Sequence, residues 1–589
     1  MSERVIPRQS TYDTVTFKLL SEQKDITNQY QTLSFVINRE VNRVPTARLT
    51  LRDGSASAET FDVSSGDDLI PGKKIEIALG HDSRDQKAFQ GIVTKQSIKV
   101  GRDGNPVLMV ECKDEAVKLT VGRQNRYFLE ATDSDAIEQI LSDRGLSKSV
   151  QSTALTHPNI VQHYATDWDF IMSRAEMNGY ITLADSGKVT VKPPTTSGST
   201  DITLTFGANL LEFETEMDAR FQYQTVKASA WDYANQALVE AEAAEPAIST
   251  VGNLSGQTLA EVINLPTWEL RHSGDLNAQE LQAWADAQLL KSRLGKIQGR
   301  VKTTGYADAK PDVLVELQGM GDRFNGQVYV SGIRHEMING SWFTHLQLGL
   351  RPEWFYKEDD ILEKPASGLL PGVNGLQIGV VVQIHDDPIG EDRIRIKIPT
   401  LDNASEGIWA RMAALDAGET RGTFFRPEVS DEVILGFLND DPRDPIVLGL
   451  LHSSAKPAPI TPTEDNFQKG IYTRSGMFLL FDDEQPSMTL ETPGGNKIVI
   501  SDQDKGIFLS DQNGNTVTLN ESGISLSSPK DISLEATGSL TLKASQDVTI
   551  QGLNVNAKAN AQFKAEGNAG AELSTSAIAV LKGSLVQIN

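Results

Sequence analysis

The chain lacks the side chains that many kinds of functional site require. Of its 589 residues only Cys112 is a cysteine, so neither an intrachain disulfide nor a cysteine-rich zinc cluster can form. No apolar run approaches the roughly 20 residues that cross a bilayer. Met1–Pro7 holds no apolar stretch of the kind that begins a secretory signal. We therefore expect the protein to be made and folded in the cytoplasm, and any export to follow another route.

Positive charge is also scarce. Lys and Arg number 55 against 79 Asp and Glu, which gives a formal net charge of −24. A surface that binds nucleic acid needs a basic face to displace counterions, so we expect no nucleic-acid partner. The length exceeds what one hydrophobic core supports and predicts about three or four domains.

The motifs of common enzyme classes are incomplete. His335-Glu336 begins like the HExxH zinc motif, but the second histidine is missing. The stretch 66–74 breaks the spacing of a phosphate loop, and no Gly-x-Ser-x-Gly elbow occurs. Cys112 lies in an alternating pattern typical of a packed thiol. We expect no catalytic residue, no cofactor and no metal site, and the protein is predicted not to be an enzyme.

The stretch 1–365 is dominated by alternation of apolar and polar residues, which predicts β-strands. The clearest of these strands are 17–20, 49–51, 74–79 and 91–94. A pattern of turn, strand, short excursion and glycine-led strand occurs twice, at 71–93 and at 311–334. This repetition predicts two duplicated small β-barrels.

Helices are expected to interrupt these strands. They are predicted at 136–141 after the caps Asp133, Ser134 and Asp135, at 168–177 after Asp167, and at 278–294 before Gly295. Residues 234–250, rich in Ala and Glu, fit either a helix or a mobile insertion.

The stretch 366–455 follows a linker rich in Pro and Gly and predicts a small closed barrel. Five short strands are expected at 379–384, 393–398, 407–412, 432–437 and 445–450. Closing five strands into an OB-type barrel removes their edges. The carboxylates of 440–444 favour a turn over a metal site, because Pro presets turn geometry and Asp bonds backbone amides. Trp409 is expected to anchor the barrel or an interface.

The last part of the sequence is built from short repeats. We assign 456–494 to a linker and the start of a shaft, and 495–589 to a needle of eight-residue repeats. The repeats align Ile532 with Leu540 and Val548, and Leu534 with Leu542 and Ile550; the same step joins Leu509 to Val517 and Val555 to Phe563. One such strand buries nothing alone, so the repeats must stack, either as a single-chain β-solenoid or as a three-chain prism. The last histidine is His452, so the needle is expected to hold no metal.

Several segments carry a resemblance to a known family. Residues 69–80 and 89–94 resemble the first barrel of phage tail hub proteins, and 162–171 resembles a helix start of the VgrG family. The strongest match is the spike base, where 392–398, 408–412 and 426–449 follow the VgrG-type pattern at fixed spacing. The chain thus resembles a VgrG-type or phage tail hub-and-spike protein of a contractile injection system.

This resemblance implies a mainly β fold. It implies tandem tube-like β-barrels with helical insertions in a hub of residues 1–365, an OB-fold collar at 366–455, and a C-terminal intertwined trimeric β-helix, or β-prism. The implied function is a structural hub and membrane-piercing spike that links the tail tube to the tip and punctures the target envelope when the sheath contracts. The implied partners are two further copies, a hexameric tail tube protein, baseplate proteins and a PAAR-like tip protein, with effector cargo left open. The particle that contains the protein would deliver it to or through the target envelope.

The final residues are the candidate site for the tip protein. Alternation places Val586 and Ile588 on one side, next to Leu585, so three copies would expose a blunt apolar end with unpaired strand edges. A cap would cover that end. The competing interpretation is a tail fibre or adhesin with a β-solenoid shaft, whose free end should carry aromatic receptor-binding patches that this end lacks. Phage, type VI secretion and free phage-like particles all remain open as the machine, although the compact hub and the repeats that continue to the end of the sequence favour a phage-like particle.

Overall fold

The computed structural model describes residues 14–102, 104–249, 251–358, 360–404 and 406–588. The chain divides into two units, one that ends at Gly449 and one that begins at Leu450. Met1–Pro7, on which the expectation about an export signal rests, lies outside the described residues. None of the described helices is long and apolar enough to span a membrane.

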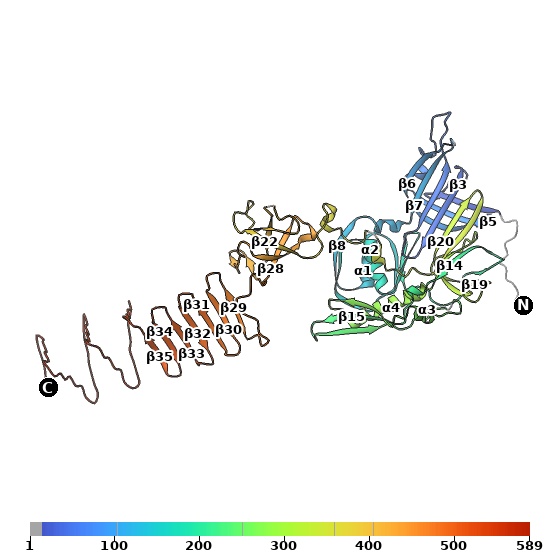
Figure 1. Ribbon diagram of the computed structural model, residues 1–589. Helices are drawn as coiled ribbons and strands as arrows, with labels where there is room; N and C mark the ends of the chain where they lie inside the picture. Colours follow the sequence, from blue (N-terminus) through green and yellow to red (C-terminus); the bar gives the residue numbers. More distant parts are fainter. Residues whose placement is uncertain (1–13, 103, 250, 359, 405, 589) are drawn as a thin grey trace. The chain divides into compact units, whose positions relative to one another are not determined.

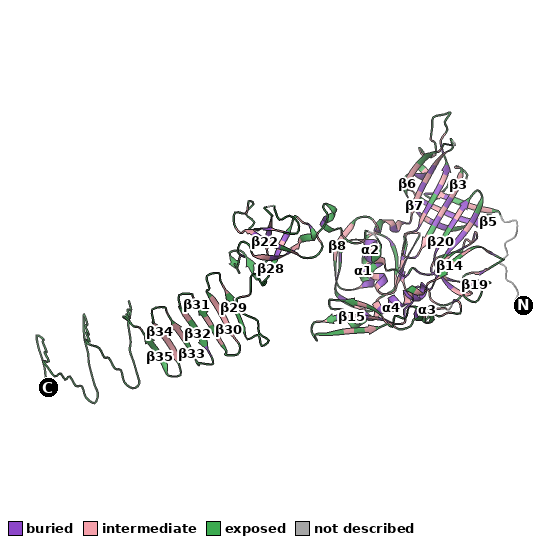
Figure 2. Cartoon of the chain, viewed as in Figure 1, coloured by how far each residue is buried: buried purple, intermediate pink, exposed green. Residues whose placement is uncertain are grey.

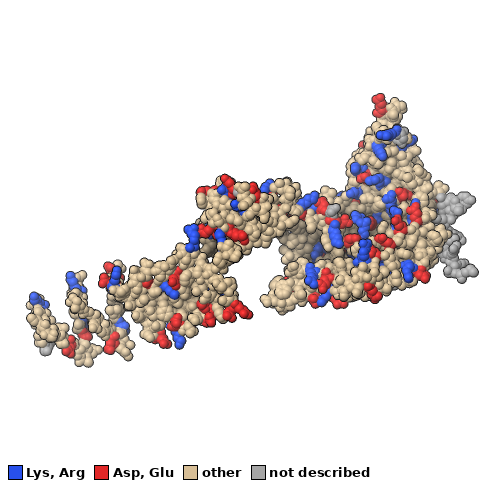
Figure 3. All heavy atoms as spheres, in the orientation of Figure 1, with Lys and Arg blue, Asp and Glu red and all other residues tan. Residues whose placement is uncertain are grey.

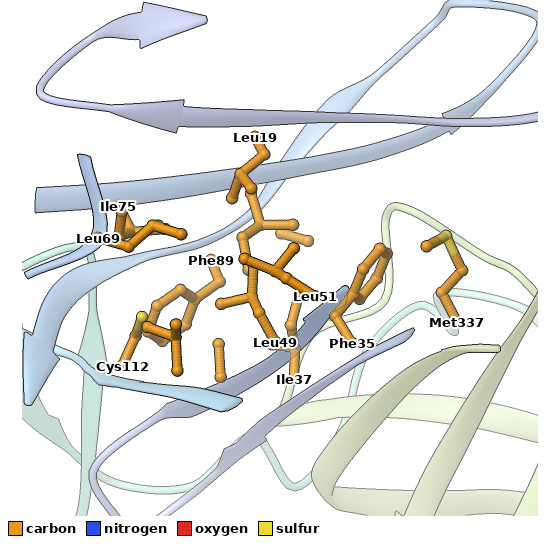
Figure 4. Packing of buried hydrophobic residues seen from close by; sticks show 14 of the residues in the cluster. Leu19, Phe35, Ile37, Leu49, Leu51, Leu69, Ile75, Phe89, Cys112 and Met337 are labelled. Atoms are coloured by element: carbon orange, nitrogen blue, oxygen red, sulfur yellow. The ribbon is translucent and has the colours of Figure 1, made fainter. Parts of the chain in front are cut away.

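The first unit contains a lobe of long strands around one core (Figure 1). The strands are β1 (Val15–Ser21), β3 (Thr32–Glu40), β4 (Thr46–Arg52), β5 (Lys74–His81), β6 (Gln86–Val100) and β7 (Pro106–Lys113). Alternate side chains point inward, so Leu19, Phe35, Leu49 and Cys112 lie in the core shown in Figure 4. Burial raises the pKa of Cys112 to about 12, as befits a packed thiol. The strands predicted in this region are confirmed.

A second lobe has a core of its own. Its strands are β13 (Thr203–Thr205), β14 (Leu210–Met217), β18 (Ile297–Thr304), β19 (Val313–Gln318), β20 (Gly326–Ile338) and β21 (Ser341–Leu348). Leu204, Val301, Val315 and Leu346 pack together inside it. The two repeated sequence segments form matching antiparallel pairs, β5 with β6 and β19 with β20. The mainly β class is confirmed, and the duplication is visible as two lobes.

The two lobes share one continuous sheet. β20 pairs with β3 from Gly332 opposite Glu40 to Ile338 opposite Ser34. The strand order is β14-β18-β21-β20-β3-β4-β7-β6-β5-β1-β2, where β2 is Lys24–Asp25. In addition, β19 pairs with β20, and β13 pairs with β19. The sequence predicts two duplicated barrels and gives no sign that their sheets are joined. Joining them pairs two strand edges that would otherwise leave backbone groups unpaired.

Two helices pack in the segment between the lobes. They are α1 (Asp133–Asp143) and α2 (Asp167–Met177), and they share a core with β8 (Arg123–Thr132), β9 (Ser147–Val150), β10 (Thr156–Thr166), β11 (Ile181–Asp185) and β12 (Lys188–Lys192). The aspartate caps are wrong, because the Thr132 and Thr166 hydroxyls accept the amide hydrogens of Asp135 and Asp169. The aspartates instead occupy the first helical turn, where the helix dipole favours negative charge.

A third helix, α4 (Ala278–Leu294), begins and ends where the sequence predicts. It packs on a sheet of β15 (Val226–Asp232), β16 (Ala237–Glu242) and β17 (Trp268–His272). β16 comes from the segment 234–250, so the expectation of a helix or mobile insertion there is wrong. Its residues alternate instead, with Val239 and Ala241 packed in the core under α4. A short helix, α3 (Gly256–Ile263), was not predicted.

The predicted closed barrel is confirmed. Its strands are β22 (Gln377–Gln383), β23 (Ile394–Lys397), β24 (Ile408–Met412), β28 (Pro445–Leu450) and β27 (Glu432–Phe437), in that order around the barrel. Val381, Ile396, Ala410 and Val433 fill the interior. A small hairpin of β25 (Ala417–Gly418) and β26 (Arg421–Gly422) was not predicted.

The second unit contains one antiparallel sheet. Its strands follow one another in chain order: β29 (Gln468–Tyr472), β30 (Phe478–Asp482), β31 (Ser487–Glu491), β32 (Lys497–Ser501), β33 (Gly506–Ser510), β34 (Thr516–Asn520) and β35 (Gly523–Ser527). Beyond β35, the described residues 528–588 form no helix or strand (Figure 1).

His335, the first residue of the incomplete zinc motif, lies inside the core. It is fully buried on β20, its Nδ1 lies 3.1 Å from the Thr344 hydroxyl, and its ring lies 5.7 Å from that of Trp342. Glu336, the next residue on the strand, points to the opposite face and approaches His345 instead. Burial, together with the nearby charges of Arg39 and His345, lowers the pKa of His335 from its ordinary value of 6.5 to about 3. His335 is therefore a neutral core residue.

This burial predicts acid sensitivity of the hub. His335 is neutral when folded and can take up a proton only on unfolding, so its contribution to stability is complete above about pH 6.5. That contribution declines as the pH falls from 6.5 towards 3, by at most about 1.4 kcal/mol per pH unit. His335→Gln should lower the melting temperature at pH 7 and should also reduce the decrease of the melting temperature between pH 7 and pH 5. The control His272→Gln, at an exposed site, should show the same decrease as the wild type. An equal decrease in all three proteins would contradict the role of His335 as a neutral core residue.

Candidate functional site: an uncovered apolar sheet face

The sheet of the second unit presents one strongly apolar face. Directly opposed residues of an antiparallel sheet point to the same side, and so do residues two apart on one strand. The strand register therefore gathers two lateral rows of side chains on a single face. One row is Ile471, Leu479, Leu490, Ile498, Leu509, Val517 and Leu526; the other is Phe481, Met488, Ile500, Ile507, Leu519 and Ile524. We call these two rows the apolar face.

The opposite face of the same sheet becomes polar along the chain. Its central row is Leu480, Thr489, Val499, Phe508, Thr518 and Ser525. The charged side chains gather instead in the turns, for example at 482–484 and 502–505, and Figure 3 shows mostly uncharged atoms over the strands. Apolar side chains therefore concentrate on the apolar face, while the opposite face mixes apolar and polar residues, and the apolar face is the one that most needs to be covered.

Among the described residues of one chain, none covers the apolar face. Leu490 is 49% exposed, Ile500 44% and Ile524 76%, and Figure 2 colours the strands as intermediate or exposed along nearly their whole length. Burying a side chain of this kind stabilises a protein by about 1.5–3 kcal/mol, so covering both rows would contribute on the order of 10 kcal/mol or more. A contiguous apolar surface of this size marks an association site.

The segment after the sheet repeats the same pattern without strand pairing. Ile532, Leu540 and Val548 are 54%, 61% and 57% exposed, and the companion row Leu534, Leu542 and Ile550 is exposed as well. A single-chain β-solenoid would bury these side chains and pair the backbone within the chain. The described part of the chain does neither, so the observed segment is not a single-chain solenoid.

One of the predicted eight-residue steps has another origin. Leu509 and Val517 are direct partners across the antiparallel strands β33 and β34, not equivalent positions of successive repeats. The chain reverses between them at Asn513-Gly514, where Gly514 adopts a φ of +87°. Sequence reasoning missed the meander and its apolar face. The signal was present, because apolar pairs two residues apart alternate there with turn residues.

The candidate tip residues lie at the described end of the chain. Leu585, Val586 and Ile588 are 82%, 51% and 86% exposed, and the structure brings none of them into a packed cluster. Val586 is the least exposed of the three. Their role at a tip stays a prediction.

The carboxylates of 440–444 form a turn. Asp441 accepts hydrogen bonds from the Arg443 amide at 2.9 Å and from the Arg443 guanidinium, which holds the pKa of that carboxyl at about 2. The guanidinium thus occupies the oxygens that a cation would need. Trp409 on β24 lies beneath two guanidinium groups, those of Arg393 and Arg395, at 6.0 and 5.8 Å from its ring centre. Among the described residues no group of three or more His, Cys, Asp or Glu side chains could hold a metal ion.

Comparison with known families covers most of the chain. Residues 11–339 match the Alg8 N-terminal domain, 377–452 the type VI secretion system/phage-baseplate injector OB domain, and 487–589 the phage baseplate V C-terminal trimerisation domain. The first match alone spans more than half of the sequence. The chain belongs to the Alg8 N-terminal domain family. Its barrel and shaft domains make it a VgrG-type spike protein.

Curated relatives of this VgrG-type spike include the type VI secretion system spike protein VgrG5 of Pseudomonas aeruginosa, 29% identical over 195 residues. Another is VgrG3 of Vibrio cholerae, 34% identical over 98 residues. These matches cover 32% and 15% of this chain, and 21% and 9% of the relatives. The chain thus spans about a fifth or less of the length of these relatives. Both relatives are named as type VI secretion system spike proteins.

Among solved structures, the 43 kDa tail protein of prophage MuSo2 from Shewanella oneidensis matches with a TM-score of 0.44 at 12% identity. The match covers 58% of this chain and 99% of that one. At this TM-score the likeness carries no conclusion about function.

Proposed function

We propose that the protein is the homotrimeric hub and spike of a contractile injection machine and that it acts mechanically, without a catalytic site. The observation that carries this proposal is the apolar face, which one chain leaves uncovered. Three sheets arranged as a triangular prism would each turn their apolar face inward and their polar face outward. The match of 487–589 to a trimerisation domain supports three as the number of copies.

The same assembly accounts for the segment 528–588. In a three-chain prism each repeat lies on one face and pairs with repeats of the two neighbouring chains, which satisfies the backbone and buries the rows that begin at Ile532 and Leu534. A closed prism exposes sheet edges only at its two ends. Such a shaft cannot bend locally without losing many hydrogen bonds together, which suits a part that is pushed through an envelope.

The hub supports a tube-docking role. Each chain contributes two β-lobes with separate cores, so three chains present six lobes, which matches the symmetry of a hexameric tail tube. We propose the tail tube and baseplate proteins as partners of the hub, and effector cargo as a further class of partner. The protein would be made in the cytoplasm, assembled into the particle and driven outward on contraction. A single-chain solenoid fibre is not favoured, because the observed shaft residues do not form one.

The trimer is tested by paired substitutions on the two faces of β32. The wild-type protein should have a mass of about three times 64.3 kDa by light scattering. Ile498→Asp would place three carboxylates in the shared core, where an unpaired buried charge costs several kcal/mol, and should shift the mass towards that of the monomer. Val499→Asp, one residue away on the outer face, should leave the trimer intact.

Two results would contradict the proposal. A stable wild-type monomer would rule out the three-chain prism. Equal effects of Ile498→Asp and Val499→Asp on the mass would show that the chains do not associate through the apolar face.

The tip is tested by truncation. We propose that a PAAR-like protein caps the trimer by adding to the unpaired strand ends near Leu585, Val586 and Ile588. Deleting residues 582–589 should abolish co-purification with that protein while the trimer persists. Replacing Lys582 by Ala should preserve capture. Capture by the truncated spike, or assembled particles that contain no such protein, would refute the capping role.

A further inference from the structure

A single segment, 349–376, joins the last hub strand β21 to the first barrel strand β22. We call the described residues of its first part, 349–358 and 360–361, the strap. The strap begins by bonding to the hub backbone, with the Gly349 amide donating to the Tyr329 carbonyl at 2.8 Å and the Leu350 amide to the Leu294 carbonyl at 3.0 Å. The strap is therefore fixed to the hub from its first residues.

The middle of the strap is held by a buried ion pair. Glu176 of α2 and Lys291 of α4 are only 7% and 8% exposed, and the Lys291 ammonium contacts the Glu176 carboxylate. Each partner also holds the strap. The Lys291 ammonium donates to the Glu353 carbonyl, and the Phe355 amide donates to Glu176 Oε2 at 2.7 Å.

The pair and the strap depend on each other. A buried ion pair is costly unless additional hydrogen bonds satisfy both groups, and here the strap supplies those bonds. Trp354 adds to the same contact, because its indole donates to Gln288 and its ring lies 5.6 Å from the Lys291 nitrogen. Lys291 lies in the last turn of α4, where unpaired helix carbonyls favour a cation.

The far end of the strap is tied down as well. Arg123 donates to the carbonyls of Asp360, at 2.5 Å, and Ile361, at 3.1 Å. An exposed pair, Arg43 with Glu358 at 3.1 Å, lies between these contacts and the buried pair.

The residues that follow the strap are hydrogen-bonded to the barrel. Asn439 donates to the Ser367 hydroxyl at 3.0 Å, and the Val373 amide donates to the Asp440 carbonyl at 2.9 Å. The Pro- and Gly-rich linker predicted at 365–372 is thus bound to the loop between β27 and β28. Residues 362–366 separate the last of these hub contacts, at Ile361, from the first of these barrel contacts, at Ser367.

We propose that the strap is a rigid coupling between hub and barrel and that the Glu176–Lys291 pair is the lock that holds it in place. A free linker would let the barrel tilt under axial load, whereas a bonded strap passes the load directly into α2 and α4. The purpose of this coupling rests on the proposed spike function. The rigidity itself does not.

The test measures the distance distribution between hub and barrel by electron spin resonance. Spin labels are placed on the exposed strand positions Lys188→Cys and Arg411→Cys, while buried Cys112 stays unlabelled. Labelled chains are diluted with unlabelled chains so that each assembly carries one pair of labels. The test variant is Glu176→Leu with Lys291→Met, which removes both side chains that bond to the strap and leaves no buried charge. The control is Lys357→Met, an exposed residue of the same strap whose side chain takes no part in the contacts described above.

The proposal predicts a narrow distribution in the wild type and the control, and at least a twofold broader one in the test variant. An unchanged width in the test variant would show that the pair is not the lock. A broad wild-type distribution would show that the coupling is not rigid. If the test variant does not fold, Trp354→Ala with Phe355→Ala, which alters only the strap, is judged by the same two outcomes. If the trimer test failed but the distance distribution between hub and barrel were narrow, the proposed spike function would be refuted while the rigid coupling would stand.

Discussion

In the second unit, backbone pairing and apolar burial cannot both be completed by one chain. The sheet β29–β35 pairs its own backbone, yet no part of the chain that the structure describes packs against its apolar face. The segment that follows leaves its apolar rows uncovered and has no strand partner of its own. Both deficits have the same remedy, which is further copies of the same chain. The function we propose depends on this requirement more than on any individual residue.

The hub meets the opposite condition, because its cores are complete within the chain. The two lobes have separate cores, the first of which also includes Met337 of β20 and Trp342 of β21, and they share one sheet through β3 and β20. The buried Glu176–Lys291 pair inside it is satisfied locally, through hydrogen bonds to the strap. A hub that completes its cores within one chain, joined to a shaft that needs further copies to bury its apolar side chains, suits the spike function that we propose.

Sequence periodicity predicted the parts of the fold that local alternation controls. The five barrel strands and α4 appear where alternation and capping residues place them. Long-range pairing was beyond its reach: the β3–β20 junction joins residues about 300 positions apart, and no local signal marks it. The expectation of a helix or a mobile insertion at 234–250 was wrong because Ala and Glu favour helices, whereas packing under α4 selects a strand. At the candidate site, the apolar rows beyond β35 were found from their eight-residue step, but the meander was missed because its hairpin spacing is irregular.

Hydrogen exchange of residues 528–588 in the intact assembly tests the central claim most directly. These residues have no strand partner among the residues that the structure describes in their own chain, so pairing with other copies is what we expect to protect their amides. The account predicts that amides at the apolar positions and their neighbours exchange at least a hundredfold more slowly than in an unfolded peptide. It also predicts that this protection disappears when the trimer is dissociated. Exchange in the intact assembly at the rate of an unfolded peptide would contradict the three-chain shaft.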